Sequence, residues 1–274
     1  MKKYFICLYR AIEKTIDNDG VEHAGYMSFM VIMALFPFLV FFLSATSFFG
    51  ASEIGQNLIE ILLDSSPENI IGSLKIRFEE LKTSPPTSLL NLAAFGTIWT
   101  SSSFVEGMRT ILNRILEIKS PPPYLTRRLL SIIQFIMLSA MLAIVMFIFV
   151  FIPVLLEKIN LHTIIDWGNI WGYWKHLYIF ACLFFCVFSF YNFIPNAKTN
   201  IYQTIPGAIL TTLSWQIGGF LFSKYIGYYH QLSLIYGSLG SIIGTLIFFY
   251  IINFLFILGA AYNYHLSKYG SKKE

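Results

Sequence analysis

Charged residues are scarce in this chain. Only 12% of its 274 residues are Asp, Glu, Lys or Arg, whereas 56% are hydrophobic and the mean hydropathy is +0.64. A soluble domain of this size carries more charge and fewer apolar side chains. The composition therefore excludes an ordinary soluble domain and predicts a polytopic membrane protein that forms a single membrane domain over residues 1–274.

Residues that build common catalytic sites are also few. Three cysteines cannot form a disulfide framework, and the five histidines are scattered along the chain. A metal site needs clustered ligands, and no phosphate-binding GxxxxGK[ST] loop is present. Basic residues follow the predicted membrane edges instead of forming a groove with exposed aromatics. We therefore expect no enzyme activity, no metal, no cofactor and no nucleic-acid partner.

Long apolar runs dominate what is present. Each is long enough to approach or exceed the roughly 20 residues that a helix needs to cross a bilayer. We predict an all-α membrane bundle with six transmembrane helices at about residues 27–49, 89–104, 129–156, 177–194, 205–226 and 235–262. The first run follows about 26 residues of mixed charge, which is unlike a cleaved signal peptide. Pro37 predicts a bend in the first span.

Amphipathic segments accompany the spans. Residues 1–26 predict a short helix on the membrane surface, and residues 51–87 predict two extracytoplasmic amphipathic helices that rest on the membrane or cap the bundle. A lid over a cavity is the alternative for residues 51–87. Trp167, Trp171 and Trp174 predict a further short helix at a membrane interface.

Lysine and arginine orient the spans. The N-terminus, the C-terminal tail and the loops after spans two and four carry 13 of them, against 6 in the other three loops. Cytoplasmic segments are richer in Lys and Arg. Both termini are therefore predicted to be cytoplasmic.

Two spans carry polar stripes. Ser102, Glu106, Arg109 and Asn113 recur at i, i+4, i+7 and i+11 and share one helix face. This face is either the solvated end of a helix or the lining of a water-filled vestibule. In the fifth span a similar stripe, which should face protein or water, contains Ala208, Thr212, Gln216, Gly219 and Ser223.

The last apolar run carries small residues on one face. These are Gly237, Ser241, Gly244 and, further along, Gly259, while Gly240 and Gly244 form a GxxxG step. Such spacing lets two helices approach closely in lipid. Asn253 falls on the opposite face, where an amide exposed to lipid would be costly. We therefore expect this helix to be central and enclosed on both sides.

Several motifs resemble a known family in their order and spacing. They are Ala34 to Pro37, Ser101 to Asn113, Phe193 to Asn196 with Pro206 to Ala208, and Tyr236 to Gly240 leading to Gly259-Ala260. Over nearly the whole chain they resemble the YihY/BrkB family of bacterial inner-membrane proteins. The resemblance implies six helices, a location in the cytoplasmic (inner) membrane and no established reaction, although some members carry an older label, ribonuclease BN. This chain departs from the family at Ala34, often Ser, and at Ala261, often a carboxylate.

These patterns favour transport or flipping of a lipid or another amphiphile in the cell envelope, with membrane lipids as partners. The residues predicted to form the pathway are Ser102, Glu106, Arg109, Asn113, Thr212, Gln216, Ser223 and Asn253. The alternatives are a small-solute transporter and an envelope scaffold. In a scaffold, copies or another envelope protein would pack on the small-residue face made by Gly237, Gly240, Ser241, Gly244 and Gly259. Ribonuclease activity is disfavoured, because the histidines and acids do not cluster.

Overall fold

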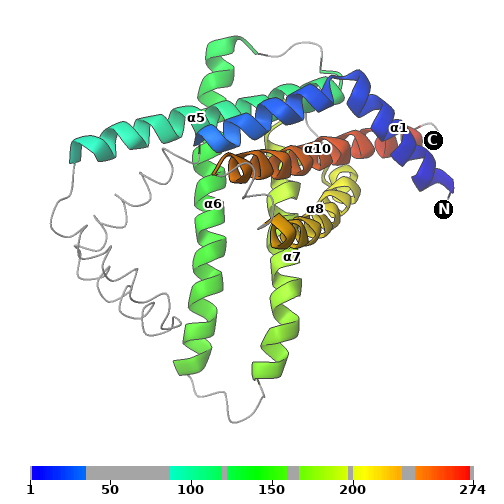
Figure 1. Cartoon of the computed structure of the whole chain (residues 1–274). Coiled ribbons are helices and arrows are strands. Elements are labelled where there is room, and N and C mark those ends of the chain that lie inside the picture. The colour runs from blue at the N-terminus through cyan, green and yellow to red at the C-terminus, as the bar shows by residue number, and fades with distance from the viewer. Residues whose placement is uncertain are drawn as a thin grey trace. The chain divides into compact units, whose positions relative to one another are not determined.

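The described part of the chain is helical. The computed structural model describes residues 2–34, 87–118, 122–158, 167–196, 200–229 and 238–271, and no strand occurs in these ranges. One helix covers residues 20–34. The others are labelled in Figure 1: α1 (Lys2–Asp17), α5 (Thr87–Ile115), α6 (Tyr124–Lys158), α7 (Trp167–Phe193), α8 (Ile201–Tyr229) and α10 (Ser238–Ser271). The predicted all-α fold class is confirmed for these residues.

Two of the described helices are long and apolar enough to cross a membrane. They are Ile201–Tyr225 within α8, with 25 residues, and Ile242–Tyr269 within α10, with 28 residues. At a rise of about 1.5 Å per residue, both exceed a hydrocarbon layer of roughly 30 Å. They overlap the fifth and sixth predicted spans, residues 205–226 and 235–262, and the second lies seven residues further along the chain than predicted. The count of six spans and the single-domain organisation stay predictions.

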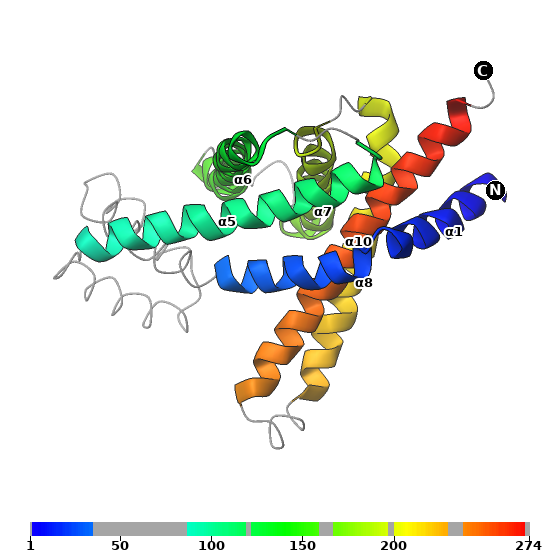
Figure 2. The ribbon, with the colours of Figure 1, turned by 90° about the horizontal axis from the view of Figure 1, so that it is seen from above.

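The chain forms two compact units, Met1–Phe29 with Ser102–Glu274, and Met30–Ser101. In the first unit, α8 and α10 lie antiparallel and side by side (Figure 2). α7 packs against α8, and α1 packs against α10. The features described below belong to this first unit.

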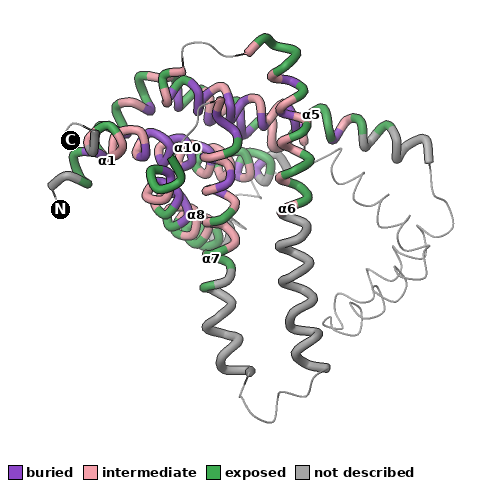
Figure 3. The backbone as a smooth tube through the Cα atoms, turned by 180° about the vertical axis from the view of Figure 1, so that it is seen from behind, coloured by how far each residue is buried: buried purple, intermediate pink, exposed green. Residues whose placement is uncertain are grey.

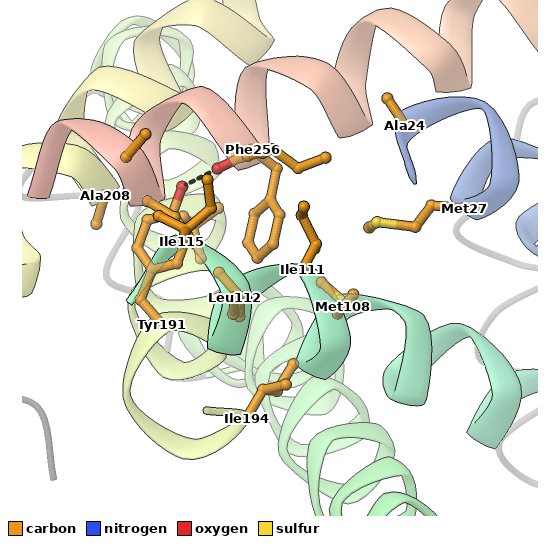
Figure 4. Close-up of a cluster of buried hydrophobic side chains, with 14 of the residues drawn as sticks. Ala24, Met27, Met108, Ile111, Leu112, Ile115, Tyr191, Ile194, Ala208 and Phe256 are labelled. Carbon is orange, nitrogen blue, oxygen red and sulfur yellow. Dashed lines mark hydrogen bonds between the residues drawn. The ribbon is translucent and has the colours of Figure 1, made fainter. Parts of the chain in front are cut away.

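The core of the first unit draws on α1, helix 20–34, α5, α7, α8 and α10. Its buried residues gather around α10 (Figure 3). α5 contributes Ile111 and Leu112, which lie close to Phe256 of α10 and Tyr191 of α7 (Figure 4). The rings of Tyr191 and Phe256 stack with their centroids 4.8 Å apart. Close-packed aromatic side chains of this kind dominate core energetics.

α8 and α10 approach each other closely at Gly207 and Gly259. A Cβ atom on Gly259 would lie 3.0 Å from the Gly207 carbonyl oxygen and 2.5 Å from the Tyr191 hydroxyl. By contrast, a Cβ atom on Gly244 would meet no atom within 4 Å. The close contact that small residues allow therefore falls in the second half of α10, and within the described chain the predicted face contributes to it only through Gly259.

Asn263 completes this junction between α8 and α10. Pro206 lies inside α8, where it cannot donate a backbone hydrogen bond. The next amide, Gly207 N, donates to Asn263 Oδ1 at 2.6 Å, and Asn263 Nδ2 donates to Thr204 O at 3.0 Å. A side chain of α10 thus satisfies backbone groups beside the proline, as a helix in lipid requires.

Two boundaries differ from the sequence-based expectation. Helix 20–34 begins at Gly20, well before residue 27, because Asp19 adopts a left-handed conformation with φ 58° that ends α1. The three tryptophans do not form a separate short helix, since α7 runs from Trp167 to Phe193 without interruption. The physical reason is that no proline separates the tryptophans from the apolar run that follows.

α10 is enclosed over only part of its length. Asn253 and the residues around Phe256 to Ala261 are buried, in line with the expected central position. Nearer its start, large aliphatic side chains are exposed, namely Ile242, Ile243, Leu246, Ile247 and Ile251. The expectation that protein surrounds the whole helix is therefore wrong for this stretch within the described chain. All these side chains are apolar, so contact with lipid costs them nothing.

Some expectations lie outside the described residues. These are the bend at Pro37, the amphipathic helices of residues 51–87 and the position of Gly237. The side chain of Ser241 is also outside them.

Candidate functional site

Arg109 is a buried charge on α5, with 1% of its side chain exposed. Its Nε donates to Ile194 O at 3.2 Å, and its Nη1 donates to Arg127 O and to Ser131 Oγ, both at 2.7 Å. Its Nη2 donates to Gln134 Oε1. A buried charge persists only when it is paired and hydrogen-bonded. The guanidinium group of Arg109 meets this condition with partners from α6 and from the end of α7.

Glu106 supplies the opposite charge one turn earlier on α5. Its Oε2 accepts from Arg109 Nη1 at 2.8 Å and from Ser131 Oγ at 2.8 Å. Its Oε1 lies 3.3 Å from Arg127 Nε. The carboxylate is therefore shared by two guanidinium groups, which leaves these three side chains with one net positive charge.

The same side chains complete the end of α7. The last carbonyl groups of a helix have no partner within it. Here Gln134 Nε2 donates to Phe193 O, and Arg109 donates to Ile194 O. Asn196 N donates to Asn113 Oδ1 at 3.0 Å. We call this set the Arg109 network; it consists of Glu106, Arg109, Asn113, Arg127, Ser131, Gln134 and the turn of residues 193–196.

Sequence reasoning identified only the α5 part of the network. The helical spacing placed Glu106, Arg109 and Asn113 on one face. Ser131 and Gln134 lie in the long apolar run of α6, where no pattern singled them out. Their separation by three residues, which puts both on one face of α6, was the available signal.

A pocket of about 410 Å³ adjoins the network, and Glu106 forms part of its wall. Helix 20–34 contributes Glu22, His23 and Tyr26, and α5 contributes Gly107 and Thr110 as well. A Cβ atom on Gly107 would lie 2.8 Å from the Tyr26 ring, so a larger residue here would have to displace this ring. We call this cavity the Glu106 pocket.

The other predicted pathway residues lie elsewhere in the unit. Ser102 and Thr212 are buried, and Thr212 Oγ1 donates to Ala208 O of its own helix at 2.8 Å. Asn253 is buried, and its Nδ2 donates to Ser28 Oγ at 3.3 Å. Gln216 is half-buried and Ser223 is exposed. Glu106, Arg109 and Asn113 are thus brought together in the Arg109 network, whereas among the predicted pathway residues only Glu106 lines the Glu106 pocket.

Glu117 forms a charged cluster just beyond α5. Lys14 Nζ donates to Glu117 Oε1 at 2.7 Å, and Lys268 Nζ lies 3.9 Å from Oε2. Hydrogen bonds from Lys14 and Tyr264 and the nearby positive charges lower the pKa of Glu117 from 4.5 to about 2. A depressed carboxyl pKa means that the folded state favours the ionised form. The Glu117 carboxylate therefore ties the end of α5 to α1 and α10.

Two residues with unusual backbone conformations carry reciprocal ion pairs. Glu117 and Asp19 both have φ of 58°, the left-handed region that favours glycine. Glu117 pairs with Lys14 of α1, while Asp19, just after α1, pairs with Arg114 of α5. Each of the two helix ends therefore carries one acidic and one basic side chain, and each acid pairs with the base of the other helix end. This arrangement joins the end of α1 to the end of α5.

No group of three or more His, Cys, Asp and Glu side chains that could hold a metal ion occurs in the described parts of the chain. The sequence-based expectation of no metal site stays a prediction.

Comparison with known proteins adds the family. A sequence model described as "Virulence factor BrkB" matches residues 11–274. The chain is 24% identical to the ribonuclease-like protein YfkH of Bacillus subtilis, over 92% of this chain and 91% of the relative. It is 22% identical to a UPF0761 membrane protein of Pseudoalteromonas translucida, over 91% of this chain and 82% of the relative. No solved structure matches. The protein is therefore a membrane protein that belongs to the BrkB virulence factor family, as its motifs predicted.

Proposed function

We propose that this protein transports or flips a lipid or another amphiphile in the bacterial inner membrane, with both termini in the cytoplasm. The observation that carries the proposal is the Glu106 pocket of about 410 Å³, which has two carboxylates and an imidazole in its wall and lies beside a buried charge network. Ionisable groups buried in membrane proteins often mark substrate paths, because their burial is costly without a function. The volume falls within the range of small-molecule sites, roughly 300–1,000 Å³.

The pocket wall suits a polar head group. Glu22 and Glu106 can accept hydrogen bonds from hydroxyl or amine groups, and His23 and Tyr26 provide further polar contacts beside apolar ring surface. His23 Nδ1 lies 3.0 Å from Asp19 O, which orients the imidazole. A head group with donors would therefore find acceptors on both helix 20–34 and α5.

Arg109 has a supporting role in this proposal. Each of its three guanidinium nitrogens already donates to a protein oxygen, so it is poorly placed to bind a head group directly. It instead fixes Glu106 through the 2.8 Å ion pair. Arg109 was predicted to line the substrate path. In this proposal it instead holds the Glu106 side chain in place.

The apolar surface of α8 suits the acyl chains. Large side chains are exposed along it, namely Ile209, Leu213, Ile217, Phe220 and Leu221. α8 is one of the two described helices that are long and apolar enough to cross a membrane. Exposed apolar side chains on such a helix are in a favourable environment when they contact lipid tails.

Liposomes with fluorescent phospholipids test the proposal. Purified protein should increase the fraction of label that dithionite quenches from outside, relative to liposomes without protein. Glu22→Gln and Thr110→Val alter the pocket without removing a partner of Arg109. Loss of a charge-assisted hydrogen bond, about 1.5–3 kcal/mol, predicts a rate lower by about tenfold or more for Glu22→Gln. Gln203→Ala, which changes an exposed residue of α8 outside the predicted pathway, is the control.

An unchanged distribution of label in protein liposomes, for phospholipids of every head group tried, would remove the transport proposal. Equal rates for wild type and both pocket variants would leave transport standing but place its path outside the Glu106 pocket.

A structural scaffold is the second candidate function, and one observation favours it. A Cβ atom on Gly244 would meet no atom within 4 Å, and the aliphatic side chains beside it, such as Ile243 and Ile247, are exposed. A second copy or another envelope protein could pack on this face through the GxxxG step at Gly240 and Gly244. Cysteine placed at Gly240 or Gly244 should then cross-link copies in native membranes. Absence of any cross-linked species at both positions would count against assembly through this face.

A further inference from the structure

A second pocket lies between α1 and the last turns of α10, with a volume of about 460 Å³. α1 contributes most of its wall, and α10 contributes His265, Lys268 and Tyr269. The pocket contains side chains of both charges: Arg10, Lys14 and Lys268 are basic, and Glu13 and Asp17 are acidic. It shares no residue with the Glu106 pocket. We call it the α1–α10 pocket.

Lys14 and Glu13 are already engaged by other side chains. Lys14 Nζ is 2.7 Å from Glu117 Oε1 and 3.8 Å from the centre of the Tyr264 ring. Glu13 is hydrogen-bonded to the Tyr9 hydroxyl. Because these contacts already engage Lys14 and Glu13, a ligand has to bind through the other charged side chains of the pocket.

Arg10, Lys268 and Asp17 are the groups that a ligand can reach. Arg10 and Asp17 are exposed, and neither takes part in an ion pair within the described ranges. Lys268 donates to the Tyr264 hydroxyl at 2.7 Å, and its side chain is 60% exposed. Arg10 and Asp17 are seven residues apart, two turns along one face of α1 and about 10 Å apart along its axis. The pocket therefore offers two positive groups and, further along α1, one negative group.

The location of the pocket favours a lipid ligand. α10 is long and apolar enough to cross a membrane, so its last turns lie near a membrane surface. α1 also presents exposed apolar side chains at helical spacing, namely Phe5, Tyr9, Ile12 and Ile16. Its opposite face is buried through Cys7, Ala11 and Thr15. A helix with an exposed apolar face and nearby charges is typical of the membrane interface.

We propose that the α1–α10 pocket binds the head group of a zwitterionic aminophospholipid. The phosphate lies between Arg10 and Lys268, the primary ammonium group donates to Asp17, and the acyl chains lie along the exposed apolar face of α1. Arginine suits the phosphate because its planar group forms two parallel hydrogen bonds. Asp17 distinguishes this ligand from an anionic lipid, because a purely anionic head group would leave the carboxylate without a partner and facing like charge. The site is separate from the transport proposal and stands without it.

Native mass spectrometry of the full-length protein tests this site. The probes are phosphatidylethanolamine, phosphatidylcholine and phosphatidylglycerol with identical acyl chains, with inorganic phosphate as a competitor. Phosphatidylethanolamine should bind about tenfold more tightly than the other two lipids. Phosphatidylcholine should be weaker because its quaternary ammonium cannot donate a hydrogen bond. Millimolar inorganic phosphate should not displace the lipid, because it lacks the ammonium group and the acyl chains.

Variants at Arg10 and Asp17 test the phosphate contact and the ammonium contact separately. Arg10→Gln should weaken all three lipids about tenfold. Asp17→Asn should remove the preference for phosphatidylethanolamine without weakening phosphatidylglycerol. Arg10→Lys keeps the charge and should retain part of the affinity, and Lys224→Gln, an exposed lysine on α8, is the charge-matched control. Both altered positions are exposed, so a melting temperature close to that of wild type is expected.

Phosphatidylglycerol binding as tightly as phosphatidylethanolamine, or an unchanged preference in Asp17→Asn, would overturn the proposal. Displacement of the lipid by inorganic phosphate would overturn it as well, since a simple anion site would explain the data. Transport activity is not among the readouts, so failure here and failure of the proposed function are distinguishable.

Discussion

Alanine at Gly259 should destabilise the protein, whereas alanine at Gly244 should not. A Cβ atom on Gly259 would contact Thr211 Oγ1 and lie 2.5 Å from Tyr191 Oη. Tyr191 Oη is 2.7 Å from Thr211 Oγ1 and donates to Phe256 O at 2.6 Å. The new methyl group must therefore separate α8 from α10 or displace the tyrosine hydroxyl.

The magnitude follows from three contributions. Overpacking a close contact costs about 1–3 kcal/mol, and loss of the two tyrosine hydrogen bonds costs about 1 kcal/mol each. The higher helix propensity of alanine returns about 1 kcal/mol. Gly259→Ala should thus lower the free energy of unfolding by about 2–4 kcal/mol. Gly244→Ala gains only the propensity, because a Cβ atom there meets nothing within 4 Å.

The free energy of unfolding can be measured in mixed micelles by titration with a denaturing detergent, with tryptophan fluorescence as the signal. Both variants lie in α10 and carry the same chemical change, so one serves as the control for the other. The two variants should shift the unfolding midpoint in opposite directions. A Gly259→Ala protein as stable as wild type, or equal shifts for both, would falsify the account of the α8–α10 contact.

Three further predictions concern polar contacts. Arg109→Met should lower the free energy of unfolding by about 3–5 kcal/mol, because it leaves the Glu106 charge and the Ile194 carbonyl with fewer partners. The same micelle titration measures this loss, and a value below about 1 kcal/mol would contradict the prediction. The depressed pKa of Glu117 stabilises the fold above about pH 4.5, and this contribution is lost as the pH falls towards 2. The difference in melting temperature between wild type and Glu117→Gln should therefore shrink on acidification; because Glu117 is more than half exposed, the contribution stays below about 1 kcal/mol, and a growing difference would refute it. Asn263→Leu should cost about 2 kcal/mol, since it removes the side-chain hydrogen bonds to Gly207 N and Thr204 O. Hydrogen exchange at Gly207 should rise, whereas an unchanged exchange rate would show that the Asn263 bond does not protect this amide.

The sequence predicted that these segments are helical and which residues share a helix face. The spacing of Glu106, Arg109 and Asn113 placed them on one face, and the structure brings that face against α6 and the end of α7. The spacing could not say whether the face meets water or protein, because a stripe looks the same in either case. The partners at Ser131 and Gln134 decide this, and they come from a segment whose local pattern is almost uniformly apolar.

The helix contact at Gly259 was predicted only in part. Small residues recur through α10, and the GxxxG step drew attention to Gly240 and Gly244. The contact actually requires a second glycine on the partner helix, which is Gly207. A pattern on one helix cannot reveal its match on another, although Pro206-Gly207-Ala208 and Gly259-Ala260 both belong to the motifs that indicated the family.

The packing of α1 against α10 has a consequence for biosynthesis. α10 begins more than 200 residues after the end of α1. At a translation rate of about 5–20 residues per second, the first helix leaves the ribosome at least ten seconds before the surface that covers Cys7, Ala11 and Thr15 exists. During that interval another surface must keep this face of the nascent helix from water, and either the bilayer surface or the insertion machinery can provide it.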